Sequence, residues 1–172
     1  KVHPYGQQTT LGTVEHLKKP SLVHIANFYE KYYVPNNMAI CISGDIKKDE
    51  AIKIVDENFS AWKPKKLAKT EEWKEKPLSG IERVTVKYPG EEYVLLAFRT
   101  APQEDKDADA LRLLDMSLSN AAAGLIDLNL VQTQKVRGAG AFPYLQNDYG
   151  AQLLFGIPKD GQTLEEVEKL LL

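Results

Sequence analysis

The chain has 172 residues, of which 43% are hydrophobic and 27% are charged. This composition excludes a disordered or fibrous protein and fits one ordinary domain or two small lobes. The 22 basic and 24 acidic residues give a net charge of -2, so the chain lacks the positive field that gathers nucleic acid. No apolar run approaches the roughly 20 residues that span a bilayer. We therefore expect no nucleic-acid partner and no membrane span.

The first third of the chain carries clear helix and strand signals. Ser21 is a good N-cap for a run of apolar residues at helical spacing, and Pro35 ends that run because the residue before a proline avoids helical backbone. A mostly apolar run then stops at Gly44, which is typical of a buried strand. These signals predict a polar loop at 1–20, a helix at 22–33, a buried strand at 38–43 and a second helix at 48–59.

The composition changes between Trp62 and Pro77, where Lys, Glu and Pro dominate and apolar periodicity is lost. This stretch is typical of a linker. Beyond it, alternation and short apolar runs predict paired strands mixed with helices, without regular strand–helix–strand alternation. The expected elements are strands at 83–88 and 93–98, helices at 108–118 and 125–136 around a small, flexible stretch at 120–124, and strands at 138–142 and 151–156. The expected fold is α+β, with two layered lobes of mixed or antiparallel sheet packed with helices.

The last element predicts an amphipathic helix. Thr163 as N-cap and Glu166 three residues later form a capping box. The chain begins without an initiator Met and stops inside this helix, so we expect a piece of a longer protein. We also expect the helix to leave its apolar stripe exposed, which would make a homodimer of the fragment possible. That stripe consists of Leu164, Val167, Leu170 and Leu171.

Three histidines are the only imidazoles: His3, His16 and His24. A His at position 12 would combine with Glu15 and His16 into His-x-x-Glu-His, in which two imidazoles one helical turn apart bind zinc and the Glu activates water. Position 12 is Gly12. We therefore expect no metal ligand and no cofactor in this chain.

Other chemical signals are weak. No Gly-x-Ser-x-Gly elbow occurs, and Cys41 lies in an apolar run, where we expect it in the core. The Gly138–Gly140 run lacks the third glycine and the helix of a dinucleotide site. Aromatic residues at helical spacing form either a ligand-stacking platform or, as we favour, part of the core. They are Phe28, Tyr29, Tyr32 and Tyr33. The sequence thus offers no catalytic, cofactor-binding or metal-binding residue.

Several motifs together resemble a known family. They are His3-Pro4-Tyr5-Gly6, the run from Phe28 through Tyr32-Tyr33 to Pro35-Asn36-Asn37-Met38, Ser43-Gly44-Asp45-Ile46, and Phe59 with Trp62. In order and spacing the chain resembles the pitrilysin and insulysin family of zinc metallopeptidases, and in particular its inactive, C-terminal-type domain. The resemblance implies a half-barrel fold, with residues 1–62 as the end of the catalytic-type lobe, 63–79 as linker and 80–172 as the start of a second, non-catalytic lobe.

The resemblance also bears on the site. The family's zinc ligands precede the segment that is similar to this chain, so zinc is implied in the parent protein. The family's substrate-gripping Arg and Tyr, separated by six residues, align with Gln134 and Ala141 if Arg137 matches the family's Arg-Gly. Arg137 and Tyr144 keep the spacing three residues later, with Pro143 interrupting the expected strand. We therefore expect a further domain or a partner chain to grip the substrate.

Two functions follow from the resemblance. The first is a non-catalytic segment of a zinc metalloendopeptidase, which forms part of a chamber that holds peptide substrates. The alternative is a structural or binding subunit of the same family without peptidase activity. In both cases the implied partner is the rest of the parent chain or a homologous subunit, and the fragment alone is expected to be inactive.

Overall fold

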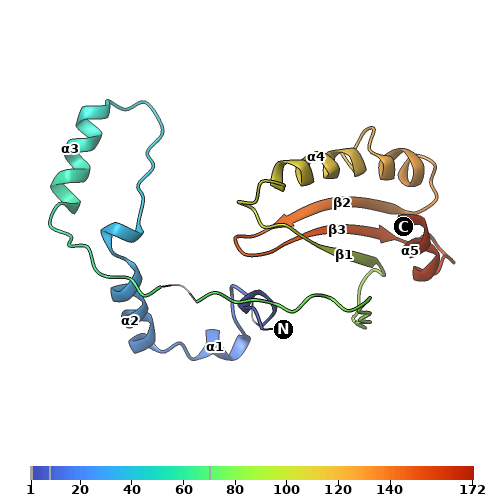
Figure 1. The fold of residues 1–172 in the computed structure, drawn as a ribbon, viewed down its shortest axis with the longest axis horizontal. Coiled ribbons are helices and arrows are strands. Elements are labelled where there is room, and N and C mark those ends of the chain that lie inside the picture. Colours follow the sequence, from blue (N-terminus) through green and yellow to red (C-terminus); the bar gives the residue numbers. More distant parts are fainter. Residues whose placement is uncertain (1, 8, 70) are drawn as a thin grey trace. The chain divides into compact units, whose positions relative to one another are not determined.

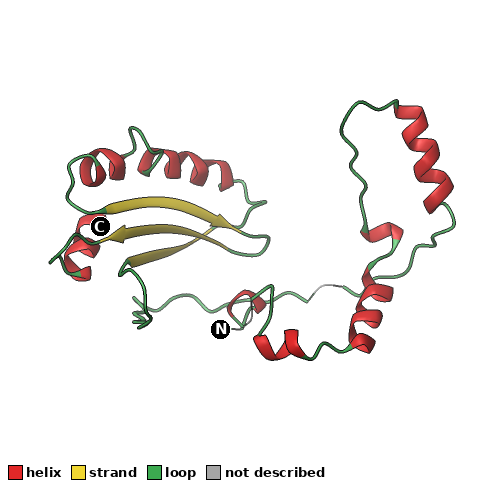
Figure 2. Cartoon of the chain, turned by 180° about the vertical axis from the view of Figure 1, so that it is seen from behind, coloured by secondary structure: helices red, strands yellow, loops and turns green. Residues whose placement is uncertain are grey.

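The computed structural model describes residues 2–7, 9–69 and 71–172, which divide into two compact units, Lys1–Arg83 and Val84–Leu172 (Figure 1). Every strand of the described chain belongs to the second unit, whereas helices occur in both (Figure 2). This mixture confirms the expected α+β class. No helix in the described ranges is long and apolar enough to cross a membrane.

The first unit is mostly helical. Its principal helices, α2 (Leu22–Tyr32) and α3 (Lys48–Phe59), lie where the sequence predicts them, and the Ser21 hydroxyl caps α2 by accepting from the His24 N–H at 3.3 Å. The predicted loop at 1–20 also contains a 3-10 turn, η1 (Pro4–Gly6), and a short helix, α1 (Val14–Lys18). Helix α1 forms because Thr13 and His16 cap each other reciprocally. Residue 8 of this loop and residue 70 of the predicted linker lie outside the described residues.

The expected strand at 38–43 is wrong for this chain. A short 3-10 turn, η2 (Pro35–Asn37), leads into it, and Met38 has extended backbone, but the segment pairs with no strand in the described ranges. Its side chains are exposed, including Cys41, which corrects the expected core position of that residue. The apolar pattern indicates that the segment tends to be buried. A strand also needs a neighbouring strand with which its backbone can form hydrogen bonds.

One side-chain amide and one carboxylate connect the expected linker to the rest of the first unit. The Glu75 carboxylate accepts from the backbone N–H groups of His3 at 2.6 Å and Val2 at 2.5 Å. These backbone donors, His3 foremost, lower the pKa of Glu75. Asn36 exchanges two hydrogen bonds with the Lys65 backbone, at 2.9 and 3.1 Å. The described residues of the expected linker form no helix or strand.

The second unit is built on a three-stranded antiparallel sheet with the order β1-β3-β2. The strands are β1 (Val94–Thr100), β2 (Gly138–Leu145) and β3 (Gly150–Ile157). The expected strand at 83–88 is not formed. Pro143 does not interrupt β2, contrary to expectation, and it lies opposite Gln152. A proline is tolerated there because β2 is an edge strand, so its missing N–H removes no hydrogen bond from a central ladder.

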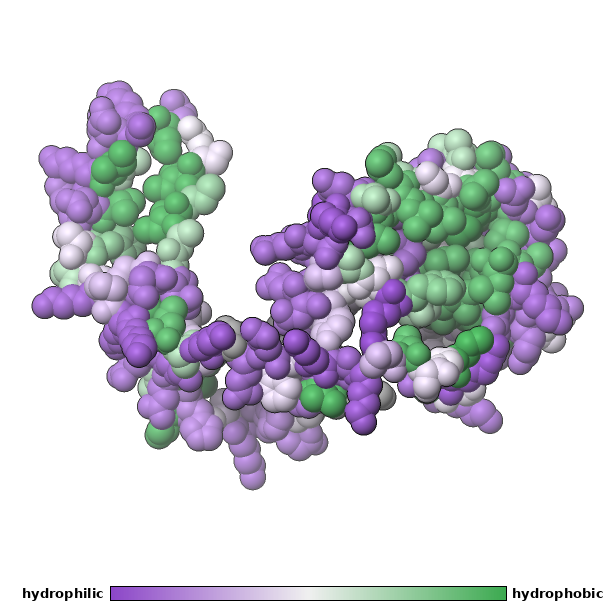
Figure 3. Space-filling view, in the orientation of Figure 1, coloured by the Kyte–Doolittle hydropathy of each residue, from purple (hydrophilic) through white to green (hydrophobic). Residues whose placement is uncertain are grey.

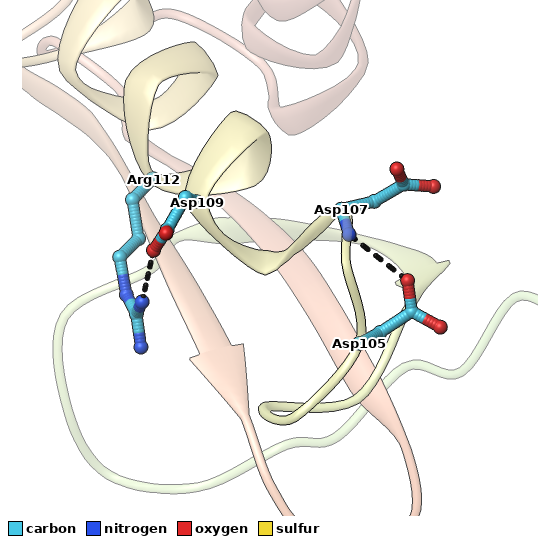
Figure 4. A network of polar contacts seen from close by, with 4 residues as sticks. All are labelled: Asp105, Asp107, Asp109 and Arg112. Carbon is cyan, nitrogen blue, oxygen red and sulfur yellow. Dashed lines mark hydrogen bonds and ion pairs between the residues drawn. The ribbon is translucent and has the colours of Figure 1, made fainter.

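Three helical segments accompany the sheet. Helix α4 (Ala108–Leu118) matches its prediction and begins after a turn in which the Asp107 N–H donates to the Asp105 carboxylate at 2.9 Å (Figure 4). The expected helix at 125–136 is confirmed over 125–131, where two α-helical residues lead into a short π-helix, η3 (Asp127–Val131), but it ends early, and Gln134 has a left-handed backbone with φ 53°. The third segment is α5 (Leu164–Leu171), whose capping box of Thr163 and Glu166 is confirmed.

The core of the second unit lies between the sheet and these helices. Its buried members are Ile126, Leu130, Val136, Leu154, Val167 and Leu171. Val167 is fully buried, and a Cβ at Gly156 on β3 would overlap it, so glycine permits α5 to approach the sheet. The expected exposed stripe of α5 is therefore wrong for Val167 and Leu171, which this chain's own sheet covers, whereas Leu170 is 36% exposed. A homodimer of the fragment stays a prediction.

Candidate functional site

The three histidines hold separate positions. His3 is buried, and its Nδ1 accepts from the Tyr5 N–H at 3.2 Å. His16 belongs to the cap of α1, and His24 is exposed on α2. In the part of the chain that the structure describes, no group of three or more His, Cys, Asp or Glu side chains could hold a metal ion. The described structure thus does not gather the three histidines into one group.

The aromatic residues of α2 are not core in this chain. Phe28, Tyr29 and Tyr33 are all exposed, which corrects the favoured expectation. They pair along the helix, Phe28 with Tyr32 at a ring-centroid distance of 4.7 Å and Tyr29 with Tyr33 at 4.8 Å. An exposed aromatic stripe of this kind is typical of a helix that packs against another segment or molecule.

The sheet has two unlike faces. Alternate residues of β3, such as Gln152 and Leu154, are buried on the side of the helices. The residues between them belong to the opposite face, which we call the open sheet face. Register places side chains from all three strands on it. Its main members are Leu95, Ala97, Arg99, Phe142, Tyr144, Leu153 and Phe155.

The open sheet face is apolar and aromatic, with one cation. Leu95 is 47% exposed, Phe142 42% and Tyr144 54%. The rings of Phe142 and Phe155 lie 6.4 Å apart, and the Arg99 guanidinium lies 5.7 Å from the Tyr149 ring. Apolar residues also gather over the surface of this unit (Figure 3). Such side chains can bury an apolar partner and orient it with a charge.

Neither position aligned with the family's gripping residues, Gln134 or Ala141, lies on the open sheet face, because Gln134 precedes β2. Ala141 lies opposite Leu154 and packs against the core, so it faces the helices. Tyr144 belongs to the open sheet face, and its hydroxyl accepts a hydrogen bond from Gln146. Arg137 forms an ion pair with Glu91. The residue that presents an aromatic hydroxyl to the open sheet face is therefore Tyr144 rather than the residue at the aligned position.

Sequence reasoning missed one important carboxylate, Asp127. It is buried and accepts from the Asn120 N–H at 2.7 Å and the Ser119 hydroxyl at 3.1 Å. The Asn120 bond is the main reason why the pKa of Asp127 is lowered. The Asn120 side chain in turn accepts from Ala122 and Ala123, so the stretch at 120–124, expected to be flexible, is a hydrogen-bonded loop. These bonds assign Asp127 a structural role. The signal available in the sequence was Ser119-Asn120 at the end of α4, a pair that favours side-chain-capped turns.

Comparison with known families and proteins identifies the class. The chain belongs to the Peptidase M16 inactive domain family, whose model matches residues 21–172. It is similar to two proteins named probable zinc protease PqqL. The one from Haemophilus influenzae is 33% identical over 60 residues, which cover 35% of this chain and 6% of that protein. The one from Escherichia coli is 32% identical over 70 residues, covering 41% and 7%. The matched region is thus less than a tenth of each relative.

Solved structures support the same class at the level of the fold. A protease from Helicobacter pylori aligns with 99% of this chain and 42% of its own, with a TM-score of 0.86 and 22% identity. The periplasmic protease PqqL from Escherichia coli aligns with 93% of this chain and 18% of its own, with a TM-score of 0.56 and 16% identity. The resemblance to a zinc metallopeptidase family, and to its inactive domain, is confirmed.

Proposed function

We propose that the chain is a non-catalytic segment of a zinc metalloendopeptidase and that its open sheet face forms part of the wall of a peptide-binding chamber. Membership of the inactive-domain family supports the non-catalytic role. The observation that carries the chamber role is the exposure of Leu95, Phe142 and Tyr144 on one side of a sheet whose other side is buried by helices.

The physical chemistry of that face favours unfolded peptides. Removing apolar surface from water is worth roughly 25 cal/mol per Å², so an extended peptide with apolar side chains gains by lying across it. The strength of such contacts depends on the apolar area that is buried and not on one defined side chain of the peptide. This suits a chamber that must accept peptides of many sequences. Arg99 adds a positive charge at one end of the face.

The first unit has a different role in this proposal. Residues 1–62 complete the catalytic-type lobe of the parent, residues 63–79 are the linker, and residues 80–172 begin the second lobe. The exposed apolar segment at 38–43 and the exposed aromatic residues of α2 support this, because both need a covering surface. In this proposal the zinc that the relatives' names imply belongs to another part of the parent protein, where its ligands and its activated water would act outside this chain.

Photo-crosslinking in the complete parent protein tests the chamber role. Tyr144 on the open sheet face is replaced by benzoylphenylalanine, and Asp109, an exposed residue of α4, is replaced in a matched control. We expect a labelled unstructured peptide to crosslink at position 144, to be displaced by unlabelled peptide, and not to crosslink at position 109. Equal labelling at both positions, or none at 144, would contradict the proposal.

A further inference from the structure

The outer edge of β1 is unpaired in the described chain. The sheet order β1-β3-β2 leaves β1 with a single neighbour, β3, along its whole length. The backbone N–H and C=O groups on its other side are therefore available to a further strand. Exposed edges of this kind recruit other strands unless the protein covers them.

The segment just before β1 is suited to that edge. Residues Val84–Tyr88, which we call the strap, alternate apolar with polar side chains, as a half-buried strand does. Val84 is 82% exposed and Val86 73%, and the strap forms no strand in the structure. It belongs to the same compact unit as the sheet. We infer that the strap closes onto the edge of β1 as a fourth, antiparallel strand.

The connection between strap and β1 limits how they pair. A two-residue hairpin at Pro89-Gly90 is disfavoured, because proline followed by glycine favours a type II turn, whose twist splays the strands. Glu91 forms an ion pair with Arg137, and both glutamates of the loop, Glu91 and Glu92, line a hollow of about 490 Å³ with residues 158–162. These side-chain contacts favour a loop that contains both glutamates. The two shortest loops that leave Glu91 and Glu92 unpaired have four residues, 89–92, and five residues, 89–93.

The two registers differ in the face of the sheet on which the apolar side chains of the strap lie. A five-residue loop places Tyr88 opposite Val94 and Val86 opposite Leu96, on the side where β1 packs against the core. A four-residue loop places Val86 opposite Leu95, on the open sheet face. Because a shift of one residue moves every apolar side chain to the other face, burial favours the five-residue loop.

The neighbouring residues agree with this register. Helix α5 contacts β1, and its Leu170 is 36% exposed, so α5 keeps apolar surface that a further strand could cover. The pairing stops at Val84, because the next step would place Arg83 opposite Arg99, and like charges directly opposite one another are destabilising. Closing the strap also removes the edge to which a foreign strand or a second copy would add.

Engineered disulfides test the register in the complete 172-residue chain with Cys41→Ser as background. Val86→Cys is combined with Leu96→Cys in one variant and with Leu95→Cys in a matched control. We expect the 86–96 pair to oxidise at least about tenfold faster than the 86–95 pair, because only its side chains lie on the same face of adjacent strands. Equal rates, or a faster 86–95 pair, would overturn the inference.

Hydrogen exchange provides a second test that needs no cysteine. Val86→Pro removes a strand donor from the strap, whereas Glu82→Pro lies outside it and serves as the control. We expect the amides of β1 to exchange about tenfold faster in the first variant and at the wild-type rate in the second, with β3 unchanged in both. Wild-type exchange in β1 under Val86→Pro would show that the strap does not cover this edge.

Discussion

The side chain of Gln152 on β3 donates a hydrogen bond from Nε2 to the Asp115 carboxylate of α4, across 2.8 Å. Gln152 is 4% exposed and Asp115 is half-buried, so this bond lies between the helix and the sheet. It links α4 to the covered face of the sheet.

Replacing Gln152 by Leu should destabilise the second unit. Leu has about the same side-chain volume as Gln, but it leaves the half-buried Asp115 carboxylate without its hydrogen-bond donor. This loss lowers the free energy of unfolding by about 1–3 kcal/mol. Chemical denaturation followed by circular dichroism measures the loss. Asp109→Asn is the control, because the Asp109–Arg112 ion pair is exposed and is worth under about 1 kcal/mol (Figure 4). If the Gln152→Leu variant is as stable as this control, the hydrogen bond does not contribute to the stability of the second unit.

The close approach of α5 depends on Gly156. A side chain there would overlap Val167, so Gly156→Ala should push the helix away from β3 and destabilise the unit by about 1–3 kcal/mol. Gly80→Ala is the matched control, since a Cβ at Gly80 meets no atom within 4 Å. Thermal unfolding separates the two variants. If both unfold at the same temperature, the helix does not need the glycine.

The loop held by Asp127 should be sensitive to acid. Its pKa is lowered in the folded chain, so the carboxylate stabilises the fold fully above its unfolded pKa, near 4, and this stabilisation is lost as the pH falls through the folded value. Asp127→Asn should lower the unfolding temperature at pH 7 and should flatten its dependence on pH below about 4. An unchanged acid dependence in the variant would assign the acid sensitivity to other carboxylates.

The linker should be the first site of proteolysis. Residues 63–79 are rich in Lys, and their described part forms no helix or strand, so a short trypsin digestion should cut there before it cuts α4 or the sheet. Mass spectrometry of the earliest fragments locates the cut. First cleavage within residues 108–136 would show that the domain boundary lies elsewhere.

The sequence predicted best those elements whose signals are local. The capping box of Thr163 and Glu166 and the spacing of α4 each involve residues within one or two helical turns, and both are found as predicted. Local signals failed where a distant partner decides the outcome. The apolar run at 38–43 is unpaired, and the predicted helix at 125–136 ends after Val131, before Gln134 with its left-handed backbone.

The same reasoning explains the error at α5. Its apolar stripe correctly predicted a need for burial, but the sequence did not reveal that Gly156 lets β3 supply the covering surface. The open sheet face was also not predicted. Which side chains share this face depends on the pairing register of β1 with β3, and α4 and η3 lie between these strands in the sequence. The family resemblance predicted the class of fold but not the positions of these side chains.

The central claim is that this chain is non-catalytic, and hydrolysis of a quenched fluorescent peptide by the purified 172 residues tests it most directly. The assay is run with added zinc and with a chelator. We expect no cleavage above the buffer blank in either condition, because no group of three or more His, Cys, Asp or Glu side chains among the described residues could hold a metal ion. Zinc-dependent cleavage that co-purifies with the chain and disappears on chelation would contradict it.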